Sequence, residues 1–590
     1  MSGPHDDGSR PIRRRLSRRR LLSSAGSAVV GLSAAALIGC DSTPPVSIPT
    51  AGETRTAGPS TPTAAPTSSI RRGGAWRIAL SADPGSLDQA ANAGGSAKVA
   101  GAPVYSRLLA YESGPGKPRA NFSTVPDAAE FTQAPDAQTF VVRLNPRAKF
   151  TQPIGRVMTS ADVKYSFERM LGRAGAMSQS GAAPLLSMVQ SIETPDDRTV
   201  TFKLKEPFGV FAPVLADPRA LMIMPAETGK AFDPARQMVG SGPFTLKSYE
   251  PGTQLSYTRN AEWHLGGDRP FLDGIEVSIL RDAPPAVSQF LAGGLDALSI
   301  GAADLKRVRD GVKGVVIDQA PPMQIQNITF SGLDFEPPWR DVRVRRAVSM
   351  AINRDAMLDE SFGLKEMKAA GLDVPYTWDG FLPWGITGYS LEAKQMKPDR
   401  AASFKFNTSE AAKLMDAAGW SGGFGVEWHS SSAFRGGYPL NARLVAQHLR
   451  EIRIILRPTI EDYGTVFLNS TIPGNFRGMA AIQQSLGEPG NYLSAMYLPA
   501  SLRNSGKIND PRLTDMVTTI SANTNREERR QQILDVQDYL ADRMYNVPLP
   551  NGPVLTAYQP SVSNVLDFQS QGVTSPIDQI PYYWKAALSG

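Results

Sequence analysis

Apolar and polar residues alternate over several short stretches of this chain, and the alternation predicts strands. Two of the predicted strands follow turn-prone pairs, Pro135-Asp136 and Asp196-Asp197, which supports the prediction. The predicted strands are 75–80, 139–144, 199–204, 254–258, 275–280 and 454–456.

Apolar residues spaced three or four positions apart predict helices in other stretches. Thr159 and Asp162 form a capping-box-like start before one such stripe, and Asp341 is the predicted N-cap of another. Further helices are predicted at 408–418, 440–452 and 533–544. Because strands and helices are interspersed along the whole chain, the predicted class is α/β, and we find no internal repeat.

The first 39 residues have the order of an export signal: a basic segment, then an apolar segment ending before Cys40. Residues 17–22 resemble a twin-arginine signal, and residues 37–40 resemble a bacterial lipobox. These resemblances imply cleavage of 1–39 as a signal peptide and a diacylglycerol on the sulfur of Cys40. Alternatively, residues 21–39 remain as a membrane helix.

Both alternatives tether the body outside the cytoplasm, to the cell membrane, in a periplasmic space or on the outer face. Residues 40–70 are rich in Pro, Thr, Ser and Ala, and they are predicted to be an extended linker. The folded body is therefore predicted to begin at Arg71.

Net charge gives no indication of a nucleic-acid partner. Seven arginines and two aspartates in residues 1–39 account for +5 of the formal net charge of +6, so the body is nearly neutral. A single cysteine excludes an intramolecular disulfide, and four scattered histidines make a Cys/His metal site an unfavoured hypothesis.

Signatures of catalysis are missing from the sequence. It contains no HExxH, GxSxG, SxxK, P-loop or GxGxxG motif. The acid pairs Asp196-Asp197 and Glu461-Asp462 are expected at solvated turns. We therefore expect a binding protein with no cofactor and no catalytic residue, although carboxylates of the glycosidase type cannot be found by spacing.

Several blocks, in order, resemble the extracellular solute-binding protein family 5, which includes the peptide- and nickel-binding lipoproteins of ABC importers. The block 104–111 is similar to the family's first helix, and 338–355 is the densest match. The remaining blocks are 79–88, 140–150, 159–169, 240–247 and 257–263.

The resemblance implies a two-lobed α/β clamp with an extra domain inserted in lobe one, which closes around a ligand by hinge motion. Lobe one is expected to be built from three separate segments of the chain. The implied division is 71–109 for the first segment of lobe one, 110–218 for the inserted domain, 219–331 for the second segment, 332–550 for lobe two and 551–590 for the third segment.

Residues 482–493 align with the family loop that carries ligand specificity. Peptide-binding members keep an aspartate there for the α-ammonium of the ligand, and this chain has Ser485. Because a neutral hydroxyl makes a weaker bond to an ammonium than a carboxylate does, a free peptide N-terminus is a doubtful ligand. Gln483, Gln484 and Asn491 suit a neutral solute with hydroxyl or amide groups, or alternatively Glu488 accepts the ammonium.

Outside this loop, Arg435 lies close to the place where some dipeptide-binding members bind the ligand carboxylate. The aromatic residues Trp378, Trp384, Tyr389 and Trp428 lie in predicted loops or strand edges of lobe two, and one or two of them are expected to line the cleft.

The favoured hypothesis is thus a lipid-anchored, monomeric substrate-binding protein that delivers a small solute to the permease subunits of an ABC importer. The solute is expected to be oligopeptide-like, an oligosaccharide or another neutral polar compound. The alternatives are a lipid-anchored extracytoplasmic hydrolase and a ligand sensor for a membrane receptor.

Overall fold

The computed structural model describes residues from 71 onward, and all of them lie in the unit 68–590. The predicted signal peptide, Cys40 and the predicted linker lie outside the described residues. The described residues are 71–91, 95–119, 122–174, 186, 188–218, 220–378, 380–386, 388–432, 434, 436–485, 487–568 and 584–585.

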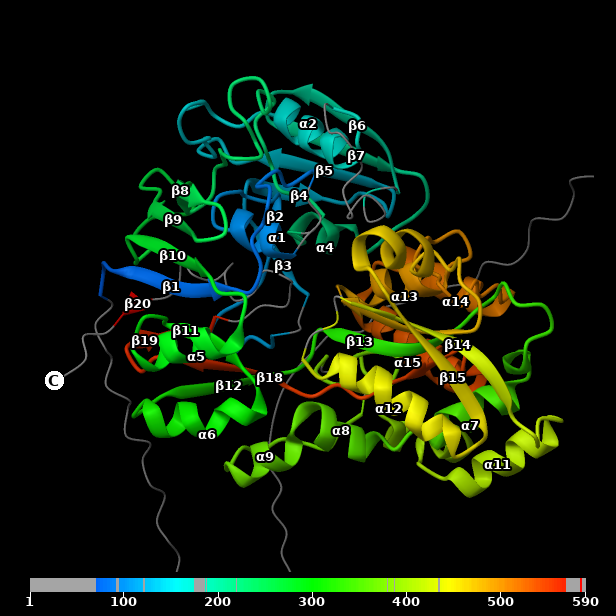
Figure 1. The fold of residues 1–590 in the computed structure, drawn as a ribbon. Coiled ribbons are helices and arrows are strands. Elements are labelled where there is room, and N and C mark those ends of the chain that lie inside the picture. The colour runs from blue at the N-terminus through cyan, green and yellow to red at the C-terminus, as the bar shows by residue number, and fades with distance from the viewer. Residues whose placement is uncertain are drawn as a thin grey trace, which may run out of the picture. The chain divides into compact units, whose positions relative to one another are not determined.

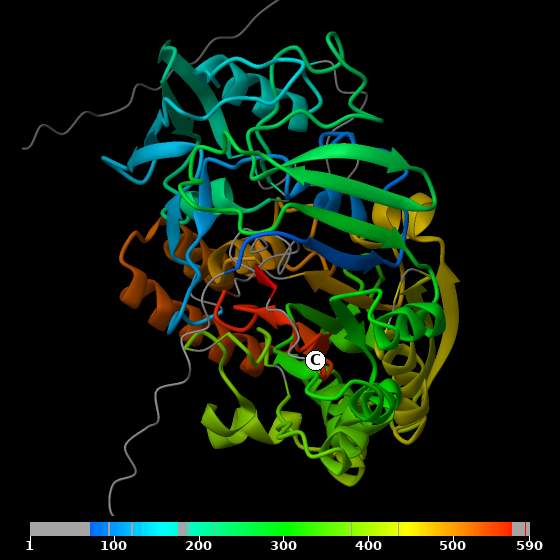
Figure 2. The same cartoon turned by 90° about the vertical axis from the view of Figure 1, so that its left-hand side faces the viewer.

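Lobe one contains two of the sheets, one of four strands and one of three (Figures 1 and 2). The four-stranded sheet has the order β1-β10-β9-β8, and the three-stranded sheet has the order β11-β18-β12. Their elements are β1 Ala75–Leu80, α1 Gly95–Gly101, β8 Phe244–Glu250, β9 Gln254–Arg259, β10 Gly274–Ile279, α5 Ala283–Leu291, β11 Ala297–Ile300, α6 Ala302–Gly311, β12 Val316–Ala320 and β18 Val554–Tyr558, with the short strands β19 Val562–Ser563 and β20 Trp584–Lys585.

The inserted domain follows β1 and α1 in the chain and has its own sheet of order β4-β5-β7-β6, with α2 against it (Figure 1). Its elements are β2 Leu109–Tyr111, β3 Thr124–Pro126, β4 Ala129–Gln133, β5 Thr139–Leu144, α2 Ser160–Met170, β6 Val189–Asp196, β7 Thr199–Leu204 and α4 Phe211–Ala216.

Lobe two is built on a five-stranded sheet of order β15-β14-β16-β13-β17, with helices packed around it (Figure 1). Its strands are β13 Gln324–Phe330, β14 Phe424–Ser431, β15 Ile454–Glu461, β16 Met479–Ser485 and β17 Asn546–Pro548. Its helices are α7 Val342–Ala351, α8 Arg354–Phe362, α9 Leu364–Ala369, α10 Pro398–Ala401, α11 Thr408–Ala417, α12 Tyr438–Arg450, α13 Pro489–Tyr497, α14 Pro511–Ala522 and α15 Arg526–Arg543, with a π-helix at Tyr463–Thr471.

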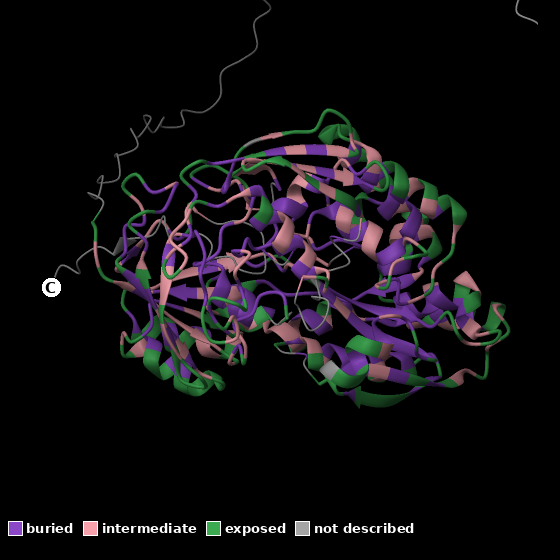
Figure 3. Cartoon of the chain, turned by 90° about the horizontal axis from the view of Figure 1, so that it is seen from above, coloured by how far each residue is buried: buried purple, intermediate pink, exposed green. Residues whose placement is uncertain are grey.

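In the described part of the chain, two crossings join the lobes, at 321–323 and at 549–553. β12 pairs antiparallel with β18 in lobe one, and β13 pairs antiparallel with β17 in lobe two. The two crossings therefore run side by side in opposite directions, which is the arrangement of a hinge ribbon. Buried residues fill the interior of each lobe, and exposed ones lie mainly on the outer helices and loops (Figure 3).

Most of the predicted elements are confirmed, and the capping residues act as expected. Asp341 accepts a hydrogen bond from the backbone N–H of Arg343, and Thr159 and Asp162 form a capping box at α2.

One prediction is wrong. Residues 104–111 are not a helix, because Val104 O accepts a hydrogen bond from Gly242 N and 109–111 pair with β3. Strand β13, which precedes residue 332, pairs with β16 and β17 and so belongs to their sheet.

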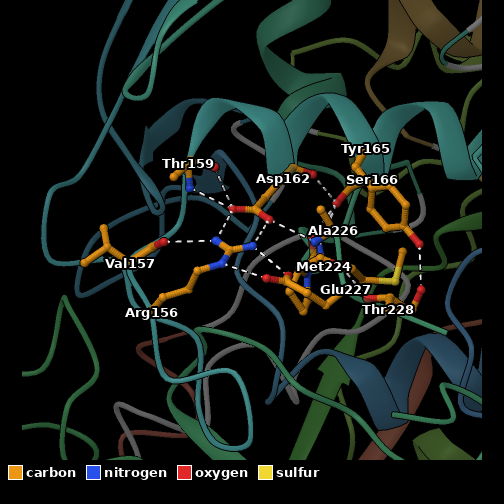
Figure 4. A network of polar contacts seen from close by, with 11 residues as sticks. Arg156, Val157, Thr159, Asp162, Tyr165, Ser166, Met224, Ala226, Glu227 and Thr228 are labelled. Atoms are coloured by element: carbon orange, nitrogen blue, oxygen red, sulfur yellow. Dashed lines mark hydrogen bonds and ion pairs between the residues drawn. The ribbon is translucent and has the colours of Figure 1, made fainter. Parts of the chain in front are cut away.

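A polar network around Asp162 joins the inserted domain to the segment 224–228 of lobe one (Figure 4). The buried carboxylate of Asp162 accepts two hydrogen bonds from Arg156, both of 2.7 Å, and one from Ala226 N at 2.9 Å. Arg156 also binds Glu227 at 2.7 Å, and Ser166 Oγ donates to Met224 O. This network therefore fixes α2 against lobe one.

We predict that Asp162→Ala lowers the free energy of unfolding by about 2–4 kcal/mol, because it removes a fully buried acceptor and leaves backbone donors unpaired. Urea unfolding followed by circular dichroism measures the change. Glu227→Ala is the matched control, because this carboxylate is 39% exposed and bonds the same guanidinium. Its cost should stay below about 1 kcal/mol, and equal costs for the two variants would contradict the assignment.

Candidate solute-binding site

The residues predicted to bind the solute lie where β16 ends, at the edge of the sheet nearest the hinge ribbon. Ser485 is in register with Gln324, and Gln483 is in register with Gln326. Gln324 begins β13 directly after the crossing at 321–323. The end of β16 therefore borders the boundary between the lobes, where a clamp must hold its ligand.

Two glutamine side chains at this edge differ in their exposure and partners. Gln483 is half-buried, and its Nε2 donates to Gln324 Oε1. Gln484 is 3% exposed, and its Oε1 accepts a hydrogen bond of 2.9 Å from Arg503 Nη1. Gln484 Nε2 is buried and has no partner among the described residues. The side chain of Ser485 lies outside the described residues.

Glu488 does not offer its carboxylate to a solute in this structure. It is 3% exposed and caps α13, where its Oε2 accepts a hydrogen bond of 2.9 Å from Asn491 N. Its Oε1 lies 3.7 Å from Arg529 Nε. Burial raises the pKa of Glu488, although the nearby Arg529 opposes this effect.

The loop aligned at 482–493 is shorter than expected, because β16 extends to Ser485 and α13 begins at Pro489. Asn491 lies in the first turn of α13, and its Oδ1 is buried without a partner in the described structure. Gln484 and Asn491 thus leave one amide donor and one amide acceptor unpaired.

The predicted aromatic residues have different surroundings. Trp428 is 1% exposed, lies on the inner strand β14 and donates to Ala442 O at 3.0 Å, so we leave it out of the proposed site. Trp384 donates to Asn551 O in the hinge ribbon at 3.1 Å, and Trp378 donates to Asp355 Oδ1 at 2.7 Å. Tyr389 is buried, and its hydroxyl accepts a hydrogen bond from Arg526.

Arg435 lies outside the described residues, so its role stays a prediction.

The acid pair Glu461-Asp462 is not simply solvated, as the sequence had suggested. Glu461 is buried, and its Oε1 lies 2.7 Å from His429 Nδ1. Thr471 Oγ1 donates to its other oxygen, and Asp462 caps the π-helix. The pairing was missed because it joins strand β14 to the end of β15, 32 residues apart.

Lobe one holds a buried cluster of charges that sequence patterns also missed. Lys98 on α1 is 2% exposed and donates to Gln89 O at 2.5 Å. Burial lowers the pKa of Lys98 to about 8, while Asp88 and Asp217 oppose the shift. Asp88 is also paired with the buried side chain of Arg169. The cluster links the segment after β1 to α1 and α2.

Within the described ranges, no helix has the length and apolar character needed to span a bilayer. The same ranges contain no group of three or more His, Cys, Asp or Glu residues arranged to hold a metal ion.

Comparison with known proteins identifies the class of this clamp. The model of the bacterial extracellular solute-binding proteins, family 5, matches residues 123–501, and the chain belongs to this family. The resemblance and the α/β two-lobed fold predicted from the sequence are thereby confirmed, as is a substrate-binding role of the ABC-importer type. The family is one of transport binding proteins that act outside the cytoplasm.

Among curated relatives, a Brucella ovis protein named as an ABC transporter peptide-binding protein is 26% identical over 430 residues, covering 69% of this chain and 75% of its own length. The D,D-dipeptide-binding protein DdpA of Escherichia coli is 29% identical over 333 residues, covering 55% of this chain and 60% of its own length.

Solved structures with the same fold bind different ligands. Helicobacter pylori DppA, in complex with the peptide STSA, has a TM-score of 0.71 at 18% identity and covers 88% of this chain and 99% of its own. AgaA of A. tumefaciens R10, in complex with agropinic acid, has a TM-score of 0.69 at 22% identity and covers 87% of this chain and 99% of its own. At these identities, the comparison supports the fold alone.

The buried cluster in lobe one generates a prediction about pH. The pKa of Lys98 is about 8 in the folded protein, whereas its reference value, which applies to the unfolded chain, is 10.5. Between about pH 8 and pH 10.5 the unfolded chain therefore binds the proton of Lys98 more tightly than the folded protein does. The contribution of Lys98 to the free energy of unfolding should therefore rise as pH increases from about 8 to about 10.5, and stay constant below about 8.

Urea unfolding of the wild type and Lys98→Met across this pH range isolates the contribution as a difference. The wild type should gain stability relative to the variant as pH rises. The exposed Lys313→Met is the control and should show no such trend. A pH-independent difference for Lys98→Met would show that the lysine is not held in an unfavourable charged state.

Proposed function

We propose that this solute-binding protein captures a neutral polar solute at residues 483–491, where β16 ends and α13 begins, which we call the solute edge. The lobes close on the solute by bending at the hinge ribbon, and the protein then delivers the solute unchanged to an ABC permease. The proposed solute is an oligosaccharide, an oligopeptide-like compound that presents no free ammonium to this edge, or a similar neutral polar compound. Gln483, Gln484, Ser485 and Asn491 are its proposed contacts. Trp378 is proposed as a further contact, as is Trp384, which bonds Asn551 O in the hinge ribbon.

The observation that carries this proposal is the state of Glu488. The sequence left open whether Glu488 replaces the missing aspartate as a partner for an ammonium. Its carboxylate is already occupied by Asn491 N and Arg529, and it is 3% exposed. An ammonium at Ser485 would therefore be desolvated with no free carboxylate offered from Glu488, which is costly.

The unpaired Gln484 Nε2 and Asn491 Oδ1 support the same conclusion, since they offer a neutral donor and a neutral acceptor. The names of the relatives point to peptides, and the ligands of the solved neighbours include agropinic acid and mannopinic acid as well as a peptide. A fold that accommodates both kinds of ligand leaves selectivity to the side chains at this edge.

We predict that the wild type binds the peptide Ser-Thr-Ser-Ala weakly when its N-terminus is free, and more tightly when the N-terminus is acetylated. Ser485→Asp should improve binding of the free peptide by about tenfold, because a charge-assisted bond replaces a neutral one. Titration calorimetry with both peptides and with a panel of oligosaccharides measures the difference.

Ser288→Asp adds the same charge on the exposed face of α5 and is the matched control, expected to change neither affinity. Tight binding of the free peptide by the wild type, lost on acetylation, would contradict the proposed solute class. X-ray scattering at saturation should also show a smaller radius of gyration, as hinge closure requires.

We further propose that the protein is a monomer, has no enzymatic activity and is anchored by a lipid on Cys40 after twin-arginine export. The proposed division of the chain is the one given by the sequence, except that lobe two begins with β13. The motifs at 17–22 and 37–40 support the anchor and the route.

We predict that Cys40→Ser abolishes labelling by a fatty-acid probe and leaves an uncleaved or released protein, because the only thiol that can carry the lipid is gone. Ser42→Ala is the control and should be labelled normally. Replacing Arg18 and Arg19 together by Lys should retain the protein inside the cell. Unchanged labelling of Cys40→Ser, or normal export of the double variant, would contradict the anchor or the route respectively.

A further inference from the structure

The junction between α14 and α15, residues 521–526, is where the inserted domain touches lobe two. Gly209, between β7 and α4, donates its N–H to Ser521 O at 2.7 Å. Arg526 Nη1 donates to Ser123 Oγ, next to β3, at 2.8 Å. Both contacts join elements on opposite sides of the lobe boundary, so they are interactions that opening of the clamp would break.

Gly209 packs directly on the backbone of this junction. A Cβ at this position would lie 2.6 Å from Asn523 O and 2.8 Å from the carbonyl carbon of Asn523. Both atoms belong to the main chain and cannot rotate away. Any side chain at residue 209 would therefore hold the inserted domain away from lobe two.

The same carbonyl is held from the other side by a residue that contacts the solute edge. Arg529 Nη1 donates to Asn523 O at 2.8 Å, and Arg529 Nε lies 3.7 Å from Glu488 Oε1. The two side chains are 10% and 2% exposed. Glu488 in turn caps α13 through Asn491 N.

A second link runs in parallel, since Ser494 Oγ on α13 lies 2.7 Å from Ser521 Oγ on α14. Ser521 is the residue whose carbonyl accepts from Gly209. Helix α13 and the junction 521–526 are therefore joined by two short paths of polar contacts.

We propose that Glu488 and Arg529 are positioning residues that couple the solute edge to the closing contact at Gly209. A solute that orders the start of α13 fixes Glu488 and, through Arg529, the carbonyl of Asn523 against which Gly209 closes. Because coupling between two sites is reciprocal, closure at Gly209 orders the solute edge to the same extent. The inference rests on the proposed function only in placing the solute at this edge.

The reciprocal direction can be tested without any solute. Hydrogen exchange of the Asn491 amide, which donates to Glu488, reports the order of the solute edge. In the full-length protein, Gly209→Ala should speed this exchange by about tenfold, although residue 209 lies in another domain. Gly301→Ala is the matched control, because a Cβ at Gly301 meets nothing within 4 Å, and it should leave the exchange unchanged.

Arg529→Met should speed the same exchange, and Arg529→Lys, which keeps a cation between Glu488 and Asn523 O, should restore it in part. Combining Gly209→Ala with Arg529→Met should have a smaller effect than the sum of the two single effects, because the path through Arg529 and Asn523 O is common to both substitutions. Additive effects of the two substitutions, or no change in Gly209→Ala, would overturn the proposal.

Solute binding is then measured with N-acetylated Ser-Thr-Ser-Ala and with the oligosaccharide panel. Gly209→Ala and Arg529→Met should each weaken the affinity for any probe that the wild type binds by about tenfold. In X-ray scattering, each should also reduce the decrease in the protein's radius of gyration on binding. If no probe binds the wild type while the exchange results hold, the proposed solute class fails and the coupling stands. If probes bind and Gly209→Ala binds them as tightly as the wild type, the coupling fails and the proposed function stands.

Discussion

The pair of crossings between the lobes is the constraint on which the rest of the structure depends. Pro321, Pro322, Pro550 and Pro553 make up half of the residues at 321–323 and 549–553. Proline has no N–H and a fixed φ, so the ladder that pairs β12 with β18 and β13 with β17 cannot continue through the crossings. The two lobes are thus separate sheets on one interrupted ribbon, able to bend at the interruption without breaking either sheet.

Lobe two holds one side of this ribbon firmly. Asn441 Nδ2 donates to Pro550 O, and Trp384 donates to Asn551 O. Leu549 N donates to Gln326 O, which extends the pairing of β13 and β17 by one more bond. The crossing strand is therefore fixed to lobe two on this side, and the end of β16 keeps its distance from the ribbon.

Features that depend on residues close together in the chain could be predicted from the sequence. Features that depend on pairing between segments far apart in the chain could not. The helix after Asp341 and the strand 75–80 follow from local patterns and were predicted correctly. Residues 104–111 look helical locally, but Gly242 and β3 hold them extended. For the same reason, the burial of Glu488 and its pairing with Arg529, 41 residues away, could not be foreseen, and the site aligned with the end of β16 stays a prediction.

Burial of Glu488 also connects selectivity to the fold. A carboxylate that is desolvated must be compensated, and here Asn491 N and Arg529 compensate it. The Glu488 carboxylate is thus part of the framework that positions α13. Under the proposed function, the solute meets amide groups such as those of Gln483 and Asn491, whose interactions with a solute are weaker one by one. Affinity at such a site would then have to come from enclosing the solute, so the contacts that close the lobes would carry more of the binding free energy than they would around a charged ligand.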